Sequence, residues 1–291
     1  MPIRNILVPI SAEAPAERQL DAAVKLARRV EGHINAVFIR PNADTVFAAL
    51  PEAARKAGVT AEAIEQELAG GEAQARTAFD AWRAGHNLAC EPVDGMLRGT
   101  YACIAAEMAP VEVAVLRHGR LSDLIVLNYP GAYQSATERA FDTAVFDSGR
   151  PVLLVRNTVP DEPLRHVMVA WNGSLEATRA VAGALPLLHA AERVSVFTAP
   201  WRNDDYLDPG DGIRQLDLPG YLTWHGIRAR SFRAGPEQKS VGAALLQAAA
   251  EHHATMLVMG AYTRSRVRAI LLGGVTSHVL QNAGLPILMA H

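Results

Sequence analysis

Short apolar runs alternate with amphipathic stretches along the chain, and this pattern predicts strands separated by helices. The segment Ile3–Ile10 is apolar almost throughout, which is typical of a strand buried on both faces. About Pro15–Val30, apolar side chains such as Leu20 and Ala27 recur on one face of a helix. The next apolar run, His33–Arg40, predicts a second strand. The chain therefore opens with a β-α-β unit.

The rest of the first half continues this alternation. A loop or short helical insertion is expected at Pro41–Gly58, before a long helix rich in Ala, Glu and Gln at about Thr60–Gly85. That helix is expected to be interrupted or bent at Gly70-Gly71, because glycine is unfavourable inside a helix. The remaining elements expected are a strand at Tyr101–Ala106, a short helix from Pro110, a strand at Ser122–Asn128, a helix at Thr137–Phe146 and a strand at Pro151–Val155.

The same order of elements then begins again. The strands expected in the second half are His166–Trp171, Val194–Ala199, Ile227–Phe232, Thr255–Met259 and Pro286–Ala290. The helices expected there are Leu175–His189, one that ends near His225, Lys239–His253 and one through Val275, Val279 and Leu280.

This repetition indicates a duplicated domain. The closing segment RPVLLV, which ends at Val155, matches LPILMA, which ends at Ala290, and DLIVLN matches TMLVMG. A repeat of about half the chain is a domain duplication and not a solenoid. We predict an α/β protein of two tandem doubly wound parallel-sheet domains, residues 1–156 and 165–291, joined by a linker with Pro160 and Pro163.

Composition narrows the functional classes. A chain of 291 residues, with 49% hydrophobic residues and a net charge of −2, is expected to be globular and not to bind nucleic acid electrostatically. No apolar run reaches the ~18 residues of a membrane helix, and the amino terminus reads as a strand and not as a signal peptide. Two cysteines are too few for a disulfide framework, so a cytoplasmic location is expected.

The strongest candidate for ligand chemistry is Met259–Leu280, MGAYTRSRVRAILLGGVTSHVL. It predicts a strand end at Gly260, a basic loop, and a glycine pair, Gly273-Gly274, that opens a helix. Free amides and the positive dipole end of such a helix suit a phosphate. The alternative is that these glycines serve only tight turns and close packing. The chain contains neither a GxxxxGK[ST] nor a GxGxxG motif.

With its two β-α-β domains, each ending in a proline-led strand, the WNGS of Trp171–Ser174 and the segment Met259–Leu280, the chain resembles a tandem universal stress protein. The resemblance covers essentially the whole chain and is strongest in the second half. It implies a Rossmann-like fold of the adenine nucleotide alpha hydrolase type, a cytoplasmic stress-response role, and ATP, with Mg²⁺, as a ligand.

Members that bind ATP share a motif of Gly, two residues, Gly, nine residues, Gly, then Ser or Thr. Here Gly260 and Gly273 match, whereas Thr263 and Gly274 depart from the pattern, and Thr276 is a candidate for the missing hydroxyl. The family aspartate after the first strand is Asn172, and in the first half Ser11. The nucleotide-binding residues that the resemblance implies are Ala170, Asn172, Val196, Gly260, Thr263, Arg264, Gly273, Gly274, Val275 and Thr276. Arg266 and Arg268 also lie in the motif loop, and for them a solvated loop face is the simpler interpretation.

Three functional classes stay open. The first is regulatory ATP binding in the second domain without catalysis, since the loops offer few groups for phosphoryl transfer. The second is a dimeric stress-response scaffold without a ligand, in which the closing strands Pro151–Val155 and Pro286–Ala290 pair to form an intrachain pseudo-dimer that associates further into a homo-oligomer. The third is a nucleotide-hydrolysing or adenylate-transferring enzyme.

Other candidate chemistry is weaker. Ser174 follows a strand as a nucleophile would, but GxSxG is absent and helix capping is the expected role. Trp171, at a strand end, is expected in the core. The histidines form no HxxxH or HExxH pair, so no zinc site or other metal site is predicted.

Overall fold

The computed structural model describes residues 2–12, 15–91, 99–130, 135–156, 159–199, 217–233, 240–261 and 274–291. By their contacts, the residues divide into two compact units, Ile3–Ser148 (the N-terminal unit) and Gly149–His291 together with Met1–Pro2 (the C-terminal unit). The prediction ended the first domain at residue 156. The contacts place the strand β5 (Val152–Val155) in the C-terminal unit, because it pairs with β10 (Ile287–Ala290).

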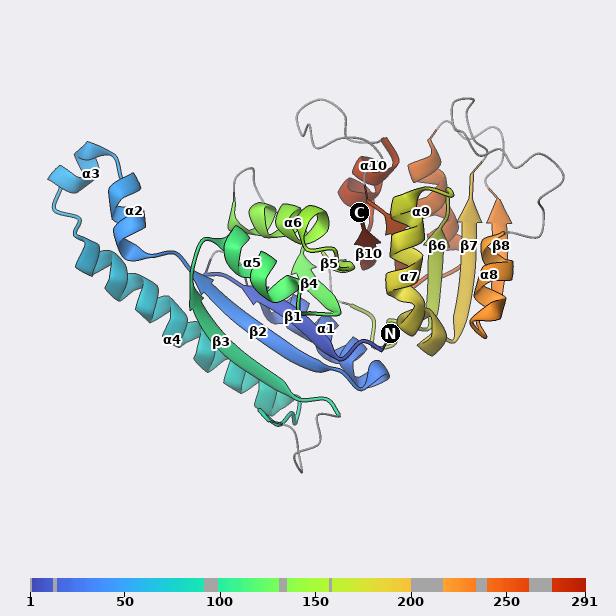
Figure 1. The fold of residues 1–291 in the computed structure, drawn as a ribbon, viewed down its shortest axis with the longest axis horizontal. Coiled ribbons are helices and arrows are strands. Elements are labelled where there is room, and N and C mark those ends of the chain that lie inside the picture. The colour runs from blue at the N-terminus through green and yellow to red at the C-terminus, as the bar shows by residue number, and fades with distance from the viewer. Residues whose placement is uncertain are drawn as a thin grey trace. The chain divides into compact units, whose positions relative to one another are not determined.

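The N-terminal unit is a parallel sheet with the strand order β3-β2-β1-β4. Its elements are β1 (Asn5–Ile10), α1 (Glu17–Val30), β2 (His33–Arg40), α2 (Ala43–Ala49), α3 (Glu52–Lys56), α4 (Ala61–Gly85), β3 (Ala102–Met108), α5 (Val111–Gly119), β4 (Leu124–Asn128) and α6 (Ala136–Asp147). Apolar side chains on both faces of β1 and β4 are buried, because α1 packs on the sheet opposite to the packed pair α5 and α6 (Figure 1). The strands and helices predicted for this half are confirmed.

The expected interruption of the long helix is wrong, since α4 continues through Gly70 and Gly71. Arg40 explains part of this continuity. Its guanidinium contacts Glu65 at 2.9 Å and Glu72 at 3.1 Å, one carboxylate on each side of the glycines. The two carboxylates are about two helical turns apart and therefore lie on one face of α4. Together with the alanines around them, these ion pairs favour the helix against a glycine cost of about 1 kcal/mol each.

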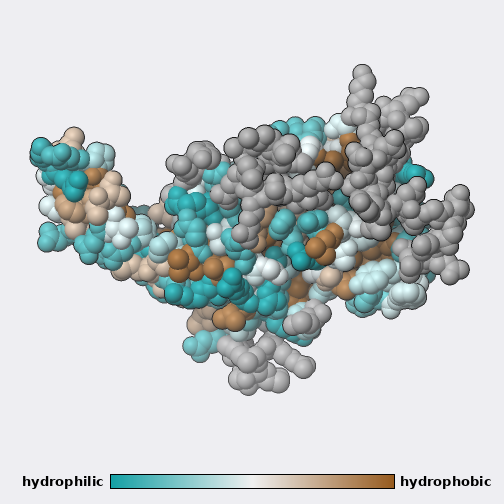
Figure 2. All heavy atoms as spheres, turned by 45° about the horizontal axis from the view of Figure 1, so that its top comes forward, coloured by the Kyte–Doolittle hydropathy of each residue, from teal (hydrophilic) through white to brown (hydrophobic). Residues whose placement is uncertain are grey.

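Beyond the sheet of the N-terminal unit, α2, α3 and the first part of α4 form an insertion between β2 and β3 (Figure 1). Helices α2 and α4 begin at side-chain caps, in which Asn42 Oδ1 accepts from the Thr45 amide and Thr60 Oγ1 accepts from the Ala63 amide. Alanines and charged side chains cover its surface, seen as pale brown and teal in Figure 2. The insertion is therefore the short helical segment expected after Pro41.

The C-terminal unit has the strand order β5-β10-β9-β6-β7-β8, parallel except that β5 runs antiparallel to β10. Its further elements are β6 (His166–Ala170), α7 (Leu175–Ala190), β7 (Arg193–Thr198), α8 (Leu218–Trp224), β8 (Ala229–Arg233), α9 (Val241–Glu251), β9 (Met256–Gly260) and α10 (Gly274–Asn282). In Figure 1, α7 and α8 lie in front of this sheet, while α9 and α10, which pack on each other, lie behind it. The α/β fold with mostly parallel sheets is confirmed.

The two closing strands pair in the register Ile287 with Leu154 and Leu288 with Leu153. All residues of both strands are buried. Pro151 leads into β5, and its ring packs against α7 at Gly183, where a Cβ atom would lie 3.1 Å from the ring. The scaffold hypothesis predicted that these strands pair, whereas oligomer formation stays a prediction.

Candidate functional site

The strand order reverses between β6 and β9 in the C-terminal unit, and open parallel sheets place a ligand crevice outside the carboxyl ends of the strands at such a point. Ala170 ends β6 and pairs with Met259, the residue before Gly260 at the end of β9. The fold therefore brings the two segments that the sequence singled out, WNGS and the start of the glycine motif, to the same edge of one sheet.

The turn from β6 into α7 is built by local hydrogen bonds. Asn172 Oδ1 accepts from the Ser174 amide at 3.1 Å, and Gly173 between them has a φ of 73°. Ser174 Oγ then accepts from the Ala177 amide at 3.1 Å and caps α7. The capping role predicted for Ser174 is confirmed. The Asn172 side chain is exposed at this edge, with its Oδ1 engaged in the turn and its Nδ2 directed to no hydrogen-bond partner among the described residues.

Gly260 is required by packing. A Cβ atom there would lie 2.6 Å from the Ala177 nitrogen and 2.8 Å from the Glu176 carbonyl carbon, both in the first turn of α7. These are backbone atoms, which a side-chain rotation cannot move aside. The packing interpretation of the motif glycines therefore accounts for this first one fully.

Gly274 differs from Gly260. It opens α10 and is exposed, and among the described residues no heavy atom lies within 4 Å of the position that a Cβ atom would take. Packing among the described residues therefore does not explain this glycine. Val275 is half-buried and Thr276 is only 6% exposed in the same turn.

The other predicted site residues divide into two groups. Val196 lies inside β7, opposite Val169, and is fully buried in the core. Thr263, Arg264 and Gly273 lie outside the described residues, as do Arg266 and Arg268. The described part of the site therefore consists of Ala170, Asn172, Gly260, Gly274, Val275 and Thr276, with Val196 buried below it.

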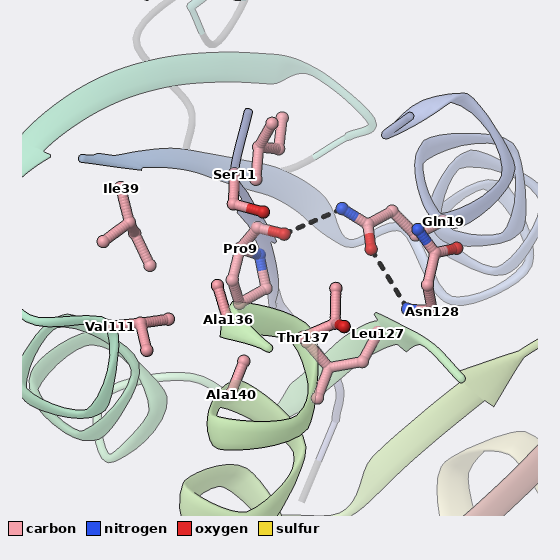
Figure 3. Close-up of a pocket in the computed structure, with 11 residues that line it drawn as sticks. Pro9, Ser11, Gln19, Ile39, Val111, Leu127, Asn128, Ala136, Thr137 and Ala140 are labelled. Carbon is pink, nitrogen blue, oxygen red and sulfur yellow. Dashed lines mark hydrogen bonds between the residues drawn. The ribbon is translucent and has the colours of Figure 1, made fainter. Parts of the chain in front are cut away.

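The corresponding crevice of the N-terminal unit, between β1 and β4, is closed by its own side chains (Figure 3). Gln19 from α1 is 4% exposed and donates through Nε2 to the Pro9 carbonyl at 2.7 Å. Its Oε1 accepts from the Asn128 amide at 3.1 Å. A cavity of about 20 Å³ remains, which is room for one water molecule and not for a nucleotide.

The start of helix α6, which borders this crevice, is capped by a side chain as well. Ser135 Oγ accepts from the Glu138 amide at 3.2 Å and lies 2.9 Å from Thr137 Oγ1. The sequence analysis did not identify Gln19. The available signal was a polar side chain next to the apolar stripe of α1, but its partner Asn128 is 109 residues away in sequence.

A buried histidine lies at the opposite, amino-terminal end of β6. His166 Nδ1 is 2.9 Å from the His252 carbonyl, and its Nε2 is 2.9 Å from Ser195 Oγ. A carbonyl oxygen only accepts, so Nδ1 carries the proton and Nε2 accepts from the Ser195 hydroxyl. Burial lowers the pKa of His166 below its ordinary value. This group is structural and lies away from the crevice.

No group of three or more His, Cys, Asp or Glu side chains among the described residues is arranged to hold a metal ion. No helix in the part of the chain that the structure describes combines the length and apolar character needed to cross a membrane.

Comparisons with known proteins agree with this geometry. Residues 163–291 match the model of the Universal stress protein family, so the chain carries one domain of that family in its second half. The fold is similar to that of a universal stress protein from Archaeoglobus fulgidus DSM 4304, with 17% sequence identity and a TM-score of 0.68 over 98% of this chain and 95% of that one. A functionally unknown protein from Pseudomonas aeruginosa PAO1 matches with 14% identity and a TM-score of 0.50 over 98% of this chain and 92% of that one. No curated protein sequence matches the chain.

Proposed function

We propose that the C-terminal unit binds an adenine nucleotide, ATP with Mg²⁺, in the crevice outside β6 and β9, as a regulatory and not a catalytic ligand. The observation that carries this proposal is Gly274, a glycine at the first position of α10 that no packing contact among the described residues requires. Glycine in a helix costs about 1 kcal/mol relative to alanine. A phosphate that must approach the amides of α10 closely would explain why glycine occupies this position despite its cost.

Two further features support the proposal. Asn172 presents its Nδ2 amide at the same edge, where it can donate to a ribose or phosphate oxygen. The equivalent crevice of the N-terminal unit is closed by Gln19, so one nucleotide per chain is expected. Membership of residues 163–291 in the universal stress protein family makes a cytoplasmic stress-response role the natural setting.

The described groups at the crevice support a regulatory and not a catalytic role. Ser174 Oγ is engaged in capping α7, and the Asn172 amide cannot act as a base near neutral pH. Neither residue is therefore suited to activate a water molecule for attack on a phosphate.

The test compares two glycine variants that differ in position only. Gly274→Val adds a branched side chain at the start of α10, whereas Gly70→Val adds the same atoms in α4, where a Cβ atom likewise meets no protein atom among the described residues. Millimolar ATP with Mg²⁺ should raise the Tm of the wild-type protein and of Gly70→Val, by an amount equivalent to about 2.7 kcal/mol at 100 times Kd. Gly274→Val should lose this shift. An unchanged shift in Gly274→Val would remove the proposed site from this crevice.

The second candidate is a scaffold without a ligand, favoured by the pairing of β5 with β10, which satisfies strand edges within the chain. Purified protein that releases no adenine nucleotide on denaturation, and whose Tm does not respond to ATP, would support the scaffold. ADP that accumulates during incubation with ATP would instead indicate an enzyme.

A further inference from the structure

A cavity of the C-terminal unit, here called the α7–α8 groove, lies on the face of the sheet that α7 and α8 cover. Its volume is about 230 Å³, and it is lined by Trp171, Thr178, Val181, Asp217, Leu218, Tyr221 and Trp224. On α8 the lining residues recur at helical spacing and form one face, and on α7 they are one turn apart. Two adjacent helices and the residue after β6 thus build the groove.

The lining of the groove is apolar and aromatic. Leu218 and Val181 are 3% and 2% exposed and form an apolar floor. Trp171, Tyr221 and Trp224 add three aromatic side chains, and Trp224 is 77% exposed. Trp171 was expected in the core, but it is only half-buried and lines this groove.

The described lining of the groove carries charge of one sign. Asp217 is the charged residue of the described lining, and none of the others is basic. Its Oδ1 accepts from the Gly220 amide at 2.8 Å and caps α8, while its second oxygen has no hydrogen-bond partner among the described residues. The Thr178 hydroxyl donates to the Ser174 carbonyl at 2.9 Å and is therefore already satisfied.

We infer that the α7–α8 groove binds a small quaternary ammonium cation as a free solute. Aromatic rings attract a cation through their π faces, and such rings are the usual recognition elements for methylated ammonium groups. A carboxylate at the rim adds charge complementarity, whereas it would disfavour an anionic or purely apolar ligand. A volume of about 230 Å³ is below the roughly 300 Å³ at which pockets for drug-sized ligands begin, and therefore suits a ligand the size of choline.

The experiment uses choline and its uncharged carbon analogue 3,3-dimethyl-1-butanol, which have the same shape. Calorimetric titration of the full chain should give saturable binding of one choline per chain, and the neutral alcohol should bind at least about tenfold more weakly. Asp217→Asn keeps the cap of α8, because asparagine is an equally good capping residue. This variant should weaken choline binding several-fold and leave the weak binding of the alcohol unchanged.

Aromatic variants test the rings. Trp224→Ala should weaken choline binding by about 2- to 30-fold, and its Tm should stay close to that of the wild type, since Trp224 is 77% exposed. Tyr221→Phe keeps the ring and should bind as the wild type does, whereas Tyr221→Ala should not. Asp44→Asn, on α2 of the other unit, removes the same charge and should have no effect.

Three results would overturn the inference. These are equal affinity for choline and its neutral analogue, an unchanged affinity in Asp217→Asn, or binding to phosphatidylcholine vesicles without binding of free choline. The inference does not depend on the nucleotide proposal, because Gly274→Val should bind choline as the wild type does.

Discussion

A Cβ atom on Gly260 would lie 2.6 Å from the backbone nitrogen of Ala177. Strand β9 and helix α7 therefore approach each other so closely that only glycine fits between them. The Ala177 amide is itself held in place by Ser174 Oγ, the cap of α7. The contact fixes the position of α7 relative to the crevice.

The first prediction concerns this contact. Gly260→Ala should lower the free energy of unfolding of the C-terminal unit by about 1–3 kcal/mol, because α7 must shift to admit the methyl group. Gly274→Ala is the matched control. Its Cβ atom meets open space among the described residues, so it should raise the stability by about 0.5–1 kcal/mol. Urea unfolding measures both, and equal stabilities for the two variants would contradict the packing argument.

The second prediction concerns Gln19, whose amide links Pro9 and Asn128 across the N-terminal crevice. Gln19→Leu keeps the volume but removes the partner of a buried carbonyl and of a part-buried amide, which should cost about 1–3 kcal/mol for the carbonyl and less for the amide. Gln66→Leu, at an exposed position of α4, is the control and should change the stability by less than about 0.5 kcal/mol. The measurement is urea unfolding of the full chain. A Gln19→Leu protein as stable as the control would show that the link is dispensable.

The third prediction uses the uninterrupted helix α4. Gly70 is exposed and a Cβ atom there meets no protein atom among the described residues, so Gly70→Ala should stabilise the protein by about 0.5–1 kcal/mol. Far-UV circular dichroism during thermal unfolding would record the rise in Tm. A destabilised variant would mean that α4 is interrupted at its glycines after all.

The fourth prediction concerns pH. Burial lowers the pKa of His166 below the ordinary value of 6.5, so below that pH the unfolded state binds more protons than the folded state. The contribution of His166 to stability is therefore complete above pH 6.5 and is lost as the pH falls toward the lowered pKa of the folded state. The slope in this window is at most about 1.4 kcal/mol per pH unit.

The measurement is urea unfolding at several pH values between 5 and 8, for the wild type and for His166→Gln. The variant should be less stable at pH 8 but should lose less stability on acidification. Burial also lowers the pKa of His33, so part of the pH dependence should persist in the variant. Parallel pH profiles for the two proteins would exclude the contribution of His166.

Local sequence patterns were sufficient to predict the strands, the helices and the class of fold. Apolar runs such as those of β1 and β9 have no polar face, so they can only be strands covered on both sides, and the helices between them follow from their apolar stripes. The capping role of Ser174 was also readable, because a cap and its acceptor lie three residues apart. Glycine lowers local helix propensity in α4, and the contacts of a distant arginine with the helix on both sides of the glycines could not be predicted from local patterns.

The sequence by itself determined where strands and helices form and that the order of elements repeats, since both depend on neighbours along the chain. Only the tertiary structure decided that one crevice is closed, because Gln19 and Asn128 are 109 residues apart and their hydrogen bond exists only once α1 packs beside β4. It also decided that Gly260 serves packing, while a Cβ atom on Gly274 would meet none of the described residues. The two glycines have different roles because the surroundings of each are set by its neighbours in space and not by its neighbours in sequence.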